Sequence, residues 1–182
     1  MRMKAPALVT TAMMFFPPLS VAQEAPPTSA TDITRAEIQT VLESMGESID
    51  RQLKVVDIGG ENVGIGILHR DGDNDTDGAL RGIIHAQVTE VYYILSGGGT
   101  LLTGGEIIDP TEPSAGSMLI GPTFSGQSRN GQIREISAGD VVVIPAGVLH
   151  AWTLIPDEVT YLSVRIDPHL ALPAGYVNPE IR

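Results

Sequence analysis

The stretch Gly139-Asp-Val-Val-Val-Ile-Pro-Ala-Gly-Val-Leu-His150 gives the most information about the fold. Its apolar residues 141–144 predict a short buried strand, and the Pro-Ala-Gly sequence that follows predicts a tight turn. A second strand then begins near His150, and Trp152 lies two positions further on, on the same face as the histidine. The stretch therefore predicts two strands joined by a turn, with a histidine and a tryptophan on one face of the second.

The rest of the chain predicts one helix followed by many short strands. Thr34 and Glu37 have the spacing of a capping box, which predicts a helix that begins there. After the helix, short apolar or alternating runs are separated by Gly-Gly, Asp-Gly, Asn-Gly and Pro-Asp turn signals. The predicted strands are 53–58, 63–69, 83–88, 91–95, 100–103, 132–136, 141–144, 149–155 and 159–166. Eight or nine short strands after one helix indicate an all-β sandwich or barrel.

An upstream segment, Glu90-Val-Tyr-Tyr-Ile-Leu-Ser-Gly97, supplies a second motif, and His85 precedes it by four intervening residues. The 139–150 segment resembles the second conserved motif of the cupin superfamily, in which a glycine is followed by five residues, P-x-G, two residues and a histidine. The family motif continues beyond the histidine to position 154, and that last position is the only departure: those proteins often carry Asn there, whereas this chain has Leu154. The upstream segment is similar to the first cupin motif in a degraded form. The likeness extends over about 53–168.

The resemblance implies the fold class and the domain organisation. The fold would be an antiparallel double-stranded β-helix, also called a cupin or jelly-roll barrel, with a short N-terminal helix. We expect one domain over 31–182, with a barrel core of about 53–168, after a flexible lead-in at 23–30. We also expect a homodimer, and the resemblance places the functional site inside the barrel.

The resemblance also implies a metal site. The family's ligand positions that survive in this sequence fall on His85, Glu90 and His150. Two imidazoles and one carboxylate suit divalent Fe, Mn, Zn or Ni, and they leave coordination positions open for a substrate. Taken one at a time, each histidine is equally explained as a hydrogen-bonded residue of the core.

Further residues are candidates for the same site. The histidine that the family places first falls on Ile83, which cannot bind a metal, and Gln87 would replace it only in a register with a shorter turn. His69, at the end of a predicted strand, is another candidate for an additional ligand. Trp152 and Tyr92 are predicted to line a substrate pocket, although Tyr92 could equally serve in packing alone.

Two functions from different classes agree with these features. The first is a metal-dependent enzyme of the dioxygenase, lyase or isomerase type that acts on a small polar molecule. The second is a non-catalytic cupin that binds a sugar or an aromatic acid, and the loss of the histidine at Ile83 favours it. The sequence does not choose the reaction or the substrate.

The composition excludes several other classes. The chain of 182 residues has no cysteine, which excludes disulfides, zinc knuckles, iron–sulfur clusters and thiol nucleophiles. It has 11 basic and 22 acidic residues, a formal charge of -11, and no basic run. Because nucleic acid binding needs clustered Lys and Arg, we expect a small molecule as the partner.

Residues 1–22 have the layout of a secretory signal peptide. Arg2 and Lys4 precede an apolar run at 5–16, and Ser20-Val-Ala22 offers the small residues of a cleavage site. The proline pair 17–18 interrupts the apolar run before it reaches the roughly 20 residues of a membrane span. We therefore expect a periplasmic or secreted protein that has no membrane attachment after cleavage and a mature charge of -13.

Two segments interrupt the strand pattern. Segment 104–127 is long, with prolines, glycines and scattered apolar residues, and it is either a surface excursion or a lid across the mouth of the barrel. Within segment 71–78, Asp73, Asp75, Asp77 and Gly78 are similar to the opening of a calcium loop, but the twelfth position counted from Asp73 is Ile84 instead of Glu. An acidic connection between strands explains the second segment without a ligand.

Overall fold

The computed structural model describes residues 28–73, 80–114 and 119–181. In these ranges one helix, α1 (Arg35–Glu43), precedes the strands β1 (Asp50–Asp57), β2 (Asn62–Asp73), β3 (Arg81–His85), β4 (Thr89–Thr103), β5 (Glu106–Ile108), β6 (Thr123–Arg129), β7 (Gln132–Ser137), β8 (Val141–Ile144) and β9 (His150–Asp167). The predicted signal peptide and most of the acidic segment 71–78 lie outside these ranges. Within them, no helix has the length and apolar character needed to cross a membrane.

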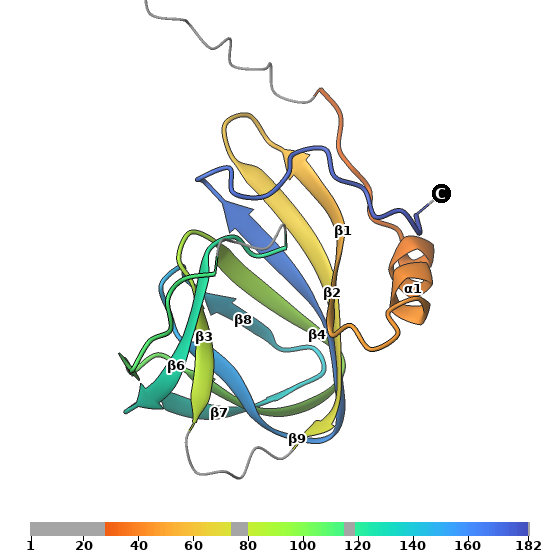
Figure 1. Ribbon diagram of the computed structural model, residues 1–182. Coiled ribbons are helices and arrows are strands. Elements are labelled where there is room, and N and C mark those ends of the chain that lie inside the picture. Colours follow the sequence, from red (N-terminus) through yellow and green to blue (C-terminus); the bar gives the residue numbers. More distant parts are fainter. Residues whose placement is uncertain (1–27, 74–79, 115–118, 182) are drawn as a thin grey trace, which may run out of the picture.

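The strands form an antiparallel barrel (Figure 1). Strand β2 pairs with β1 and β9, and β3 pairs with β6 and with the first residue of β9. The long strands β4 and β9 take part in both sides of the barrel. Strand β4 pairs with β8 through its first half and with β7 through its second half, and β9 pairs with β2, β3 and β4. This arrangement confirms the predicted fold class, an antiparallel double-stranded β-helix with a short N-terminal helix.

Strand β4 continues through a glycine run that the sequence predicted as a turn. Gly97 has a φ of 67°, and the register between β4 and β9 shifts between Gly97 and Thr100. A side chain at Gly97 or Gly99 would collide with a backbone carbonyl of β9. Because glycine allows this close approach, both strands bend together and continue. The predicted breaks at 96–99 and 156–158 are therefore wrong.

Segment 104–127 is also more regular than predicted. Strand β5 and the first part of β6 lie within it, and the two strands pair with each other. Ile107 and Phe124 pack against a buried cluster on the β3 side of the barrel. This burial of apolar side chains explains why part of the segment is ordered as a hairpin instead of an irregular loop.

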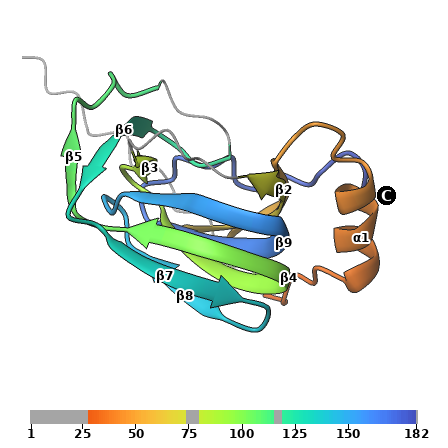
Figure 2. The same cartoon turned by 90° about the horizontal axis from the view of Figure 1, so that it is seen from below.

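Two apolar clusters lie on opposite sides of β2. Ile67 packs with Val41 and Met45 in the cluster beneath α1, whereas the next residue, Leu68, belongs to the cluster inside the barrel. Helix α1 begins with the predicted capping box of Thr34 and Glu37. Figures 1 and 2 show α1 beyond β1 and β2, with β6 on the far side of the barrel. The helix is therefore outside the barrel and leaves its interior to other side chains.

The C-terminal half of β9 directs polar side chains into the barrel. Ser163, Arg165 and Asp167 are each 0% exposed, whereas Ile166 is 37% exposed. Apolar residues therefore lie on the outer face of this strand and polar residues on its inner face. This reversal of the usual pattern places a charged network in the interior.

Candidate metal centre

Three buried side chains from three strands meet inside the barrel. His85 ends β3, Glu90 follows the start of β4, and His150 begins β9. The Nε2 atoms of His85 and His150 lie 3.2 and 3.4 Å from Oε2 of Glu90. The connection 86–88 between β3 and β4 is short, and His150 pairs with β3 through the backbone of Ile83. The structure thus brings together the three ligands that the cupin motifs imply.

The hydrogen bonds of His150 determine which of its ring nitrogens carries the proton. Its Nδ1 lies 3.1 Å from the carbonyl oxygen of Val148, and a carbonyl only accepts hydrogen bonds. Nδ1 therefore donates, which leaves Nε2 as the ring atom available to a metal. This Nε2 atom is buried and has no hydrogen-bond partner among the described residues.

His85 is oriented in the same way through a hydroxyl group. Its Nδ1 lies 2.9 Å from Oγ1 of Thr123, and that hydroxyl donates its own hydrogen to the carbonyl of Gly121 at 3.1 Å. Thr123 must therefore accept the hydrogen bond from Nδ1 of His85. As in His150, Nε2 is the ring atom that faces Glu90 and is available to a metal.

The carboxylate of Glu90 is held by donors on both oxygens. Oε1 accepts hydrogen bonds from Ser163 at 2.7 Å and from Nε of Arg165 at 3.2 Å, and Oε2 accepts one from Tyr92 at 2.9 Å. Burial raises the pKa of Glu90, but His150, His85 and Arg165 outweigh burial and hold this pKa well below its usual range. Glu90 is therefore ionised at neutral pH.

This donor set fits a divalent cation. Two imidazole nitrogens and one carboxylate oxygen lie within 4.8 Å of one another, and all three can donate an electron pair to a metal. Ligand atoms that share an ion at ~2.1 Å lie roughly 3 Å apart, which matches the separations of 3.2 and 3.4 Å. Each imidazole is also oriented through its other nitrogen, as metal-binding histidines usually are. His85, Glu90 and His150 would hold the ion.

Replacing Thr123 with valine is expected to lower the affinity for a divalent metal by ~10- to 100-fold. The substitution keeps the shape of the side chain but removes the hydroxyl that accepts from Nδ1 of His85. Affinity can be measured by competition with a chromophoric chelator. Thr111→Val is the matched control, because Thr111 is exposed and bonds only within β6 and its neighbouring segment. Equal affinities in the two variants would contradict this role of Thr123.

Arg165 connects Glu90 to a wider buried network. Besides Glu90, its guanidinium binds Oδ2 of Asp50 at 2.6 Å and the side-chain oxygen of Gln52. The side chain of this arginine is completely buried. Gly66 makes room for the guanidinium, since a Cβ atom there would lie 2.8 Å from one of its nitrogens. Burial raises the pKa of Asp50, and Arg165 opposes this rise only in part.

A cavity of about 220 Å³ adjoins two of the three candidate ligand residues, His85 and Glu90. His85, Glu90 and Tyr92 line it together with the charged side chains of Asp50 and Arg70. The rest of its lining is apolar and consists of Ile49, Leu68, Ile83, Leu119 and Ile120. The last two residues belong to segment 104–127, so part of the segment that the sequence left open as an excursion or a lid borders this cavity. The cavity offers a small, mostly apolar space with a few charged groups.

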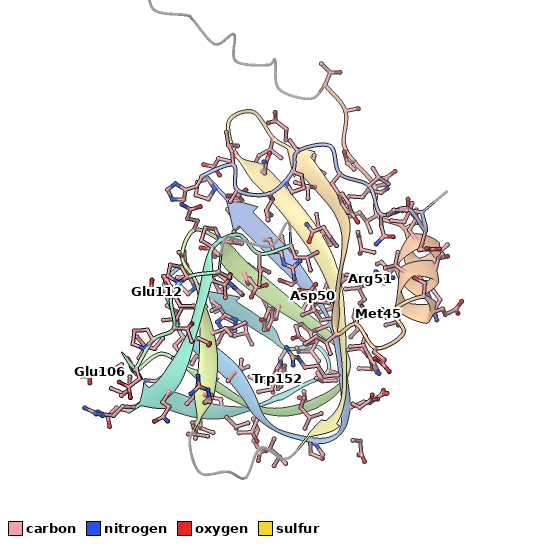
Figure 3. The ribbon with its side chains drawn as sticks, viewed as in Figure 1. Met45, Asp50, Arg51, Glu106, Glu112 and Trp152 are labelled. Atoms are coloured by element: carbon pink, nitrogen blue, oxygen red, sulfur yellow. The ribbon has the colours of Figure 1, made fainter. Side chains whose placement is uncertain are left out.

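The two aromatic candidates for the pocket lie at different depths. Tyr92 borders the cavity and donates its hydroxyl hydrogen to Glu90. Trp152 does not border the cavity, because its indole nitrogen is directed to the hydroxyl of Tyr161, 3.2 Å away. Figure 3 shows Trp152 in the lower part of the barrel and Asp50 at the start of β1. Trp152 was predicted to line the substrate pocket, but its indole nitrogen bonds to Tyr161 and its side chain does not line this cavity.

The two candidates for an additional ligand are not part of this group. His69 follows Leu68 on β2 and so faces the helix side, where its Nδ1 lies 2.8 Å from Oγ1 of Thr160. Its separation from the centre follows from the alternation of side chains along the strand. Gln87 is half-buried in the connection between β3 and β4, and no hydrogen bond in the described ranges joins it to the three ligands.

Sequence reasoning missed three charged residues of the interior, Asp50, Arg70 and Arg165. The usual rule places apolar residues inside and charged residues outside, and β9 reverses it. A signal was present in the alternation itself, since Ser163, Arg165 and Asp167 occupy every second position of one strand. With His150 on the same strand, that polar face was a candidate lining for the barrel.

Comparisons with known proteins give structural matches only. No family model matches the chain, and no curated protein matches it. A cupin protein from Bacteroides fragilis is 18% identical, with 63% of this chain and 72% of that chain covered and a TM-score of 0.37. A protein from Bacillus halodurans is 14% identical, with 84% and 92% covered and a TM-score of 0.45. The DMSP lyase DddQ from Ruegeria pomeroyi is 18% identical, with 71% and 50% covered and a TM-score of 0.40.

The strand connections and the positions of the two motifs define the class of fold. The first motif spans the β3–β4 connection and the first half of β4, and the second spans β8 and the start of β9. These strands meet in an antiparallel double-stranded β-helix, so that both motifs face one interior. The chain has a cupin-type fold.

Proposed function

We propose that this chain is an exported, divalent-metal-dependent enzyme that acts on a small molecule inside the barrel. The observation that carries the proposal is the convergence of Nε2 of His85, Nε2 of His150 and Oε2 of Glu90, each of which can donate an electron pair to a metal. The adjoining cavity supports an enzyme over a purely structural metal site, because a structural site is normally closed by protein ligands. The layout of residues 1–22 supports export.

The chain's own residues would prepare the site for catalysis. A bound divalent ion would supply Lewis acidity and coordination positions for the substrate. Tyr92 keeps its proton, because burial raises its pKa well above the usual value and Glu90 raises it further. Its hydroxyl and Arg165 fix the carboxylate of Glu90, and the cavity beside the carboxylate offers room for a substrate. Dioxygenation, lyase chemistry and isomerisation all remain compatible with this arrangement.

Metal loading of the purified protein tests the proposal. After incubation with Fe(II), Mn(II), Zn(II) or Ni(II) and desalting, we expect about one ion per chain for at least one of these metals. In the Mn(II)-loaded protein, the relaxation rate of water protons should increase, because an enzyme site keeps a coordination position open to water. Absence of bound metal, or a bound ion without access to water, would contradict the proposal.

A non-catalytic binding protein is the second candidate, and Ile83 favours it. This residue occupies the position of the histidine missing from the first motif, and it lines the cavity. A binding protein of this kind should bind no stoichiometric metal and should retain a small molecule during purification. Mass spectrometry of the supernatant after denaturation detects such a molecule, so the same sample separates the two functions.

A further inference from the structure

Arg70 borders the cavity without an acidic partner. Its Nε donates to the hydroxyl of Tyr161 at 3.3 Å, and no carboxylate of the described residues lies within 4.0 Å of its guanidinium. The indole nitrogen of Trp152 donates a hydrogen bond to the same hydroxyl. Arg70 is thus held by one nitrogen, while its two terminal amino groups have no hydrogen-bond acceptor among the described residues. Such a fork is suited to bind a carboxylate with two parallel hydrogen bonds.

The charges around the cavity also favour an anionic ligand. The two carboxylates of Glu90 and Asp50 both pair with Arg165, and Arg70 adds a second positive charge, so that the four groups together carry no net charge. A divalent ion at the candidate metal centre would therefore add two positive charges without compensation. Uncompensated charge is costly in a buried site, and an anionic ligand removes that cost.

The size and the lining of the cavity limit the rest of the ligand. A cavity volume of about 220 Å³ favours a small ligand. Most side chains around it are apolar, including Leu68, Leu119 and Ile120. We propose that the cavity binds a small carboxylic acid in its anionic form, with its carboxylate on Arg70 and a short apolar body against these side chains. The inference deepens the proposed function by naming a substrate class, although the contact with Arg70 does not require the metal.

Binding of matched acids and amides tests this inference. Linear carboxylates from acetate to hexanoate and the primary amides of equal length are titrated into the full chain by calorimetry, with and without Zn(II). We expect each acid that fits to bind at least about 10-fold more tightly than its amide, because a charge-assisted pair with Arg70 is lost in the amide. In Arg70→Gln this preference should disappear. Arg81→Gln, which changes an exposed arginine on β3, should retain it.

A second variant keeps the test decisive if Arg70→Gln does not fold. Ile83→Phe narrows the cavity without touching Arg70, so the longest acid that binds should become shorter while the preference for acids over amides remains. Equal binding of acids and amides to the wild-type chain, or an unchanged preference in a folded Arg70→Gln variant, would overturn the inference. If the protein binds no metal but shows the preference through Arg70, the proposed function fails and this inference stands.

Discussion

In the His150→Ala variant, bound metal should fall from about one ion per chain to background, a loss of affinity greater than the ~100-fold effect of removing a supporting hydrogen bond. His150 provides one of only two nitrogen donors, and its Nε2 atom has no other partner among the described residues. His85→Ala should have the same effect, because its Nε2 atom lies 3.2 Å from the shared carboxylate oxygen. Elemental analysis after loading and desalting measures both losses.

Two histidine variants serve as controls for this experiment. His169 is exposed beyond β9, and His69 lies on the helix side of β2, so alanine at either position should leave the metal content unchanged. The melting temperature of the metal-free protein identifies any variant that has merely lost its fold. Full metal content in a folded His150→Ala or His85→Ala variant would show that the replaced histidine is not a metal ligand. Loss of metal in His69→Ala would add a ligand that the structure does not place there.

Replacing Arg165 with methionine is expected to destabilise the metal-free protein by about 3–5 kcal/mol. The side chain is completely buried and binds Glu90, Asp50 and Gln52. Methionine fills much of the volume but leaves the buried carboxylate of Glu90 and the partly buried carboxylate of Asp50 without their cation, which is more costly than losing both members of an ion pair. Urea denaturation, followed by circular dichroism, measures the change in the free energy of unfolding.

Three further variants distinguish the contribution of the charge network to stability from the contribution of packing. Arg134→Met changes an exposed arginine on β7 and should alter stability by less than ~0.5 kcal/mol. Arg165→Lys should recover only a small part of the loss, because one ammonium group cannot reproduce the planar fork that reaches three acceptors. Adding Asp50→Asn to Arg165→Met should recover part of it by removing one unpaired charge. A destabilisation below ~1 kcal/mol in Arg165→Met would show that the network contributes little.

The fold was predictable where local geometry is restrictive. The second motif combines an apolar strand, a proline and two glycines, and the structure gives Gly139 and Gly147 positive φ values of 93° and 81°. Few backbones accept that combination, so β8 and the start of β9 were placed correctly. The glycines of β4 were misleading, because glycine permits a turn and a close approach of two strands equally well. Only the tertiary contact with β9 distinguishes these two uses.

Some residues of the candidate site could likewise be predicted from the sequence, and others could not. His85 and Glu90 flank one short connection, so the spacing along the chain was enough to suggest that they act together. The roles of Arg70 and Arg165 depend on which face of a strand points inward, and the usual rule assigns the charged face to the solvent. The supporting hydroxyl of Thr123 comes from β6, within a segment whose pairing could not be predicted from its composition.

The assembly of the centre from distant strands bears on how the protein folds. Glu90 and His150 are 60 positions apart in the chain, and the two become neighbours only when β9 joins β3 and β4. An unfolded chain offers the ion at most the local pair of His85 and Glu90, which lacks the third donor. Pairing of strands so distant in sequence is slow, since much chain entropy is lost before the contacts form. A metal would therefore be captured late in folding, and it would stabilise the closed barrel without guiding the chain toward it.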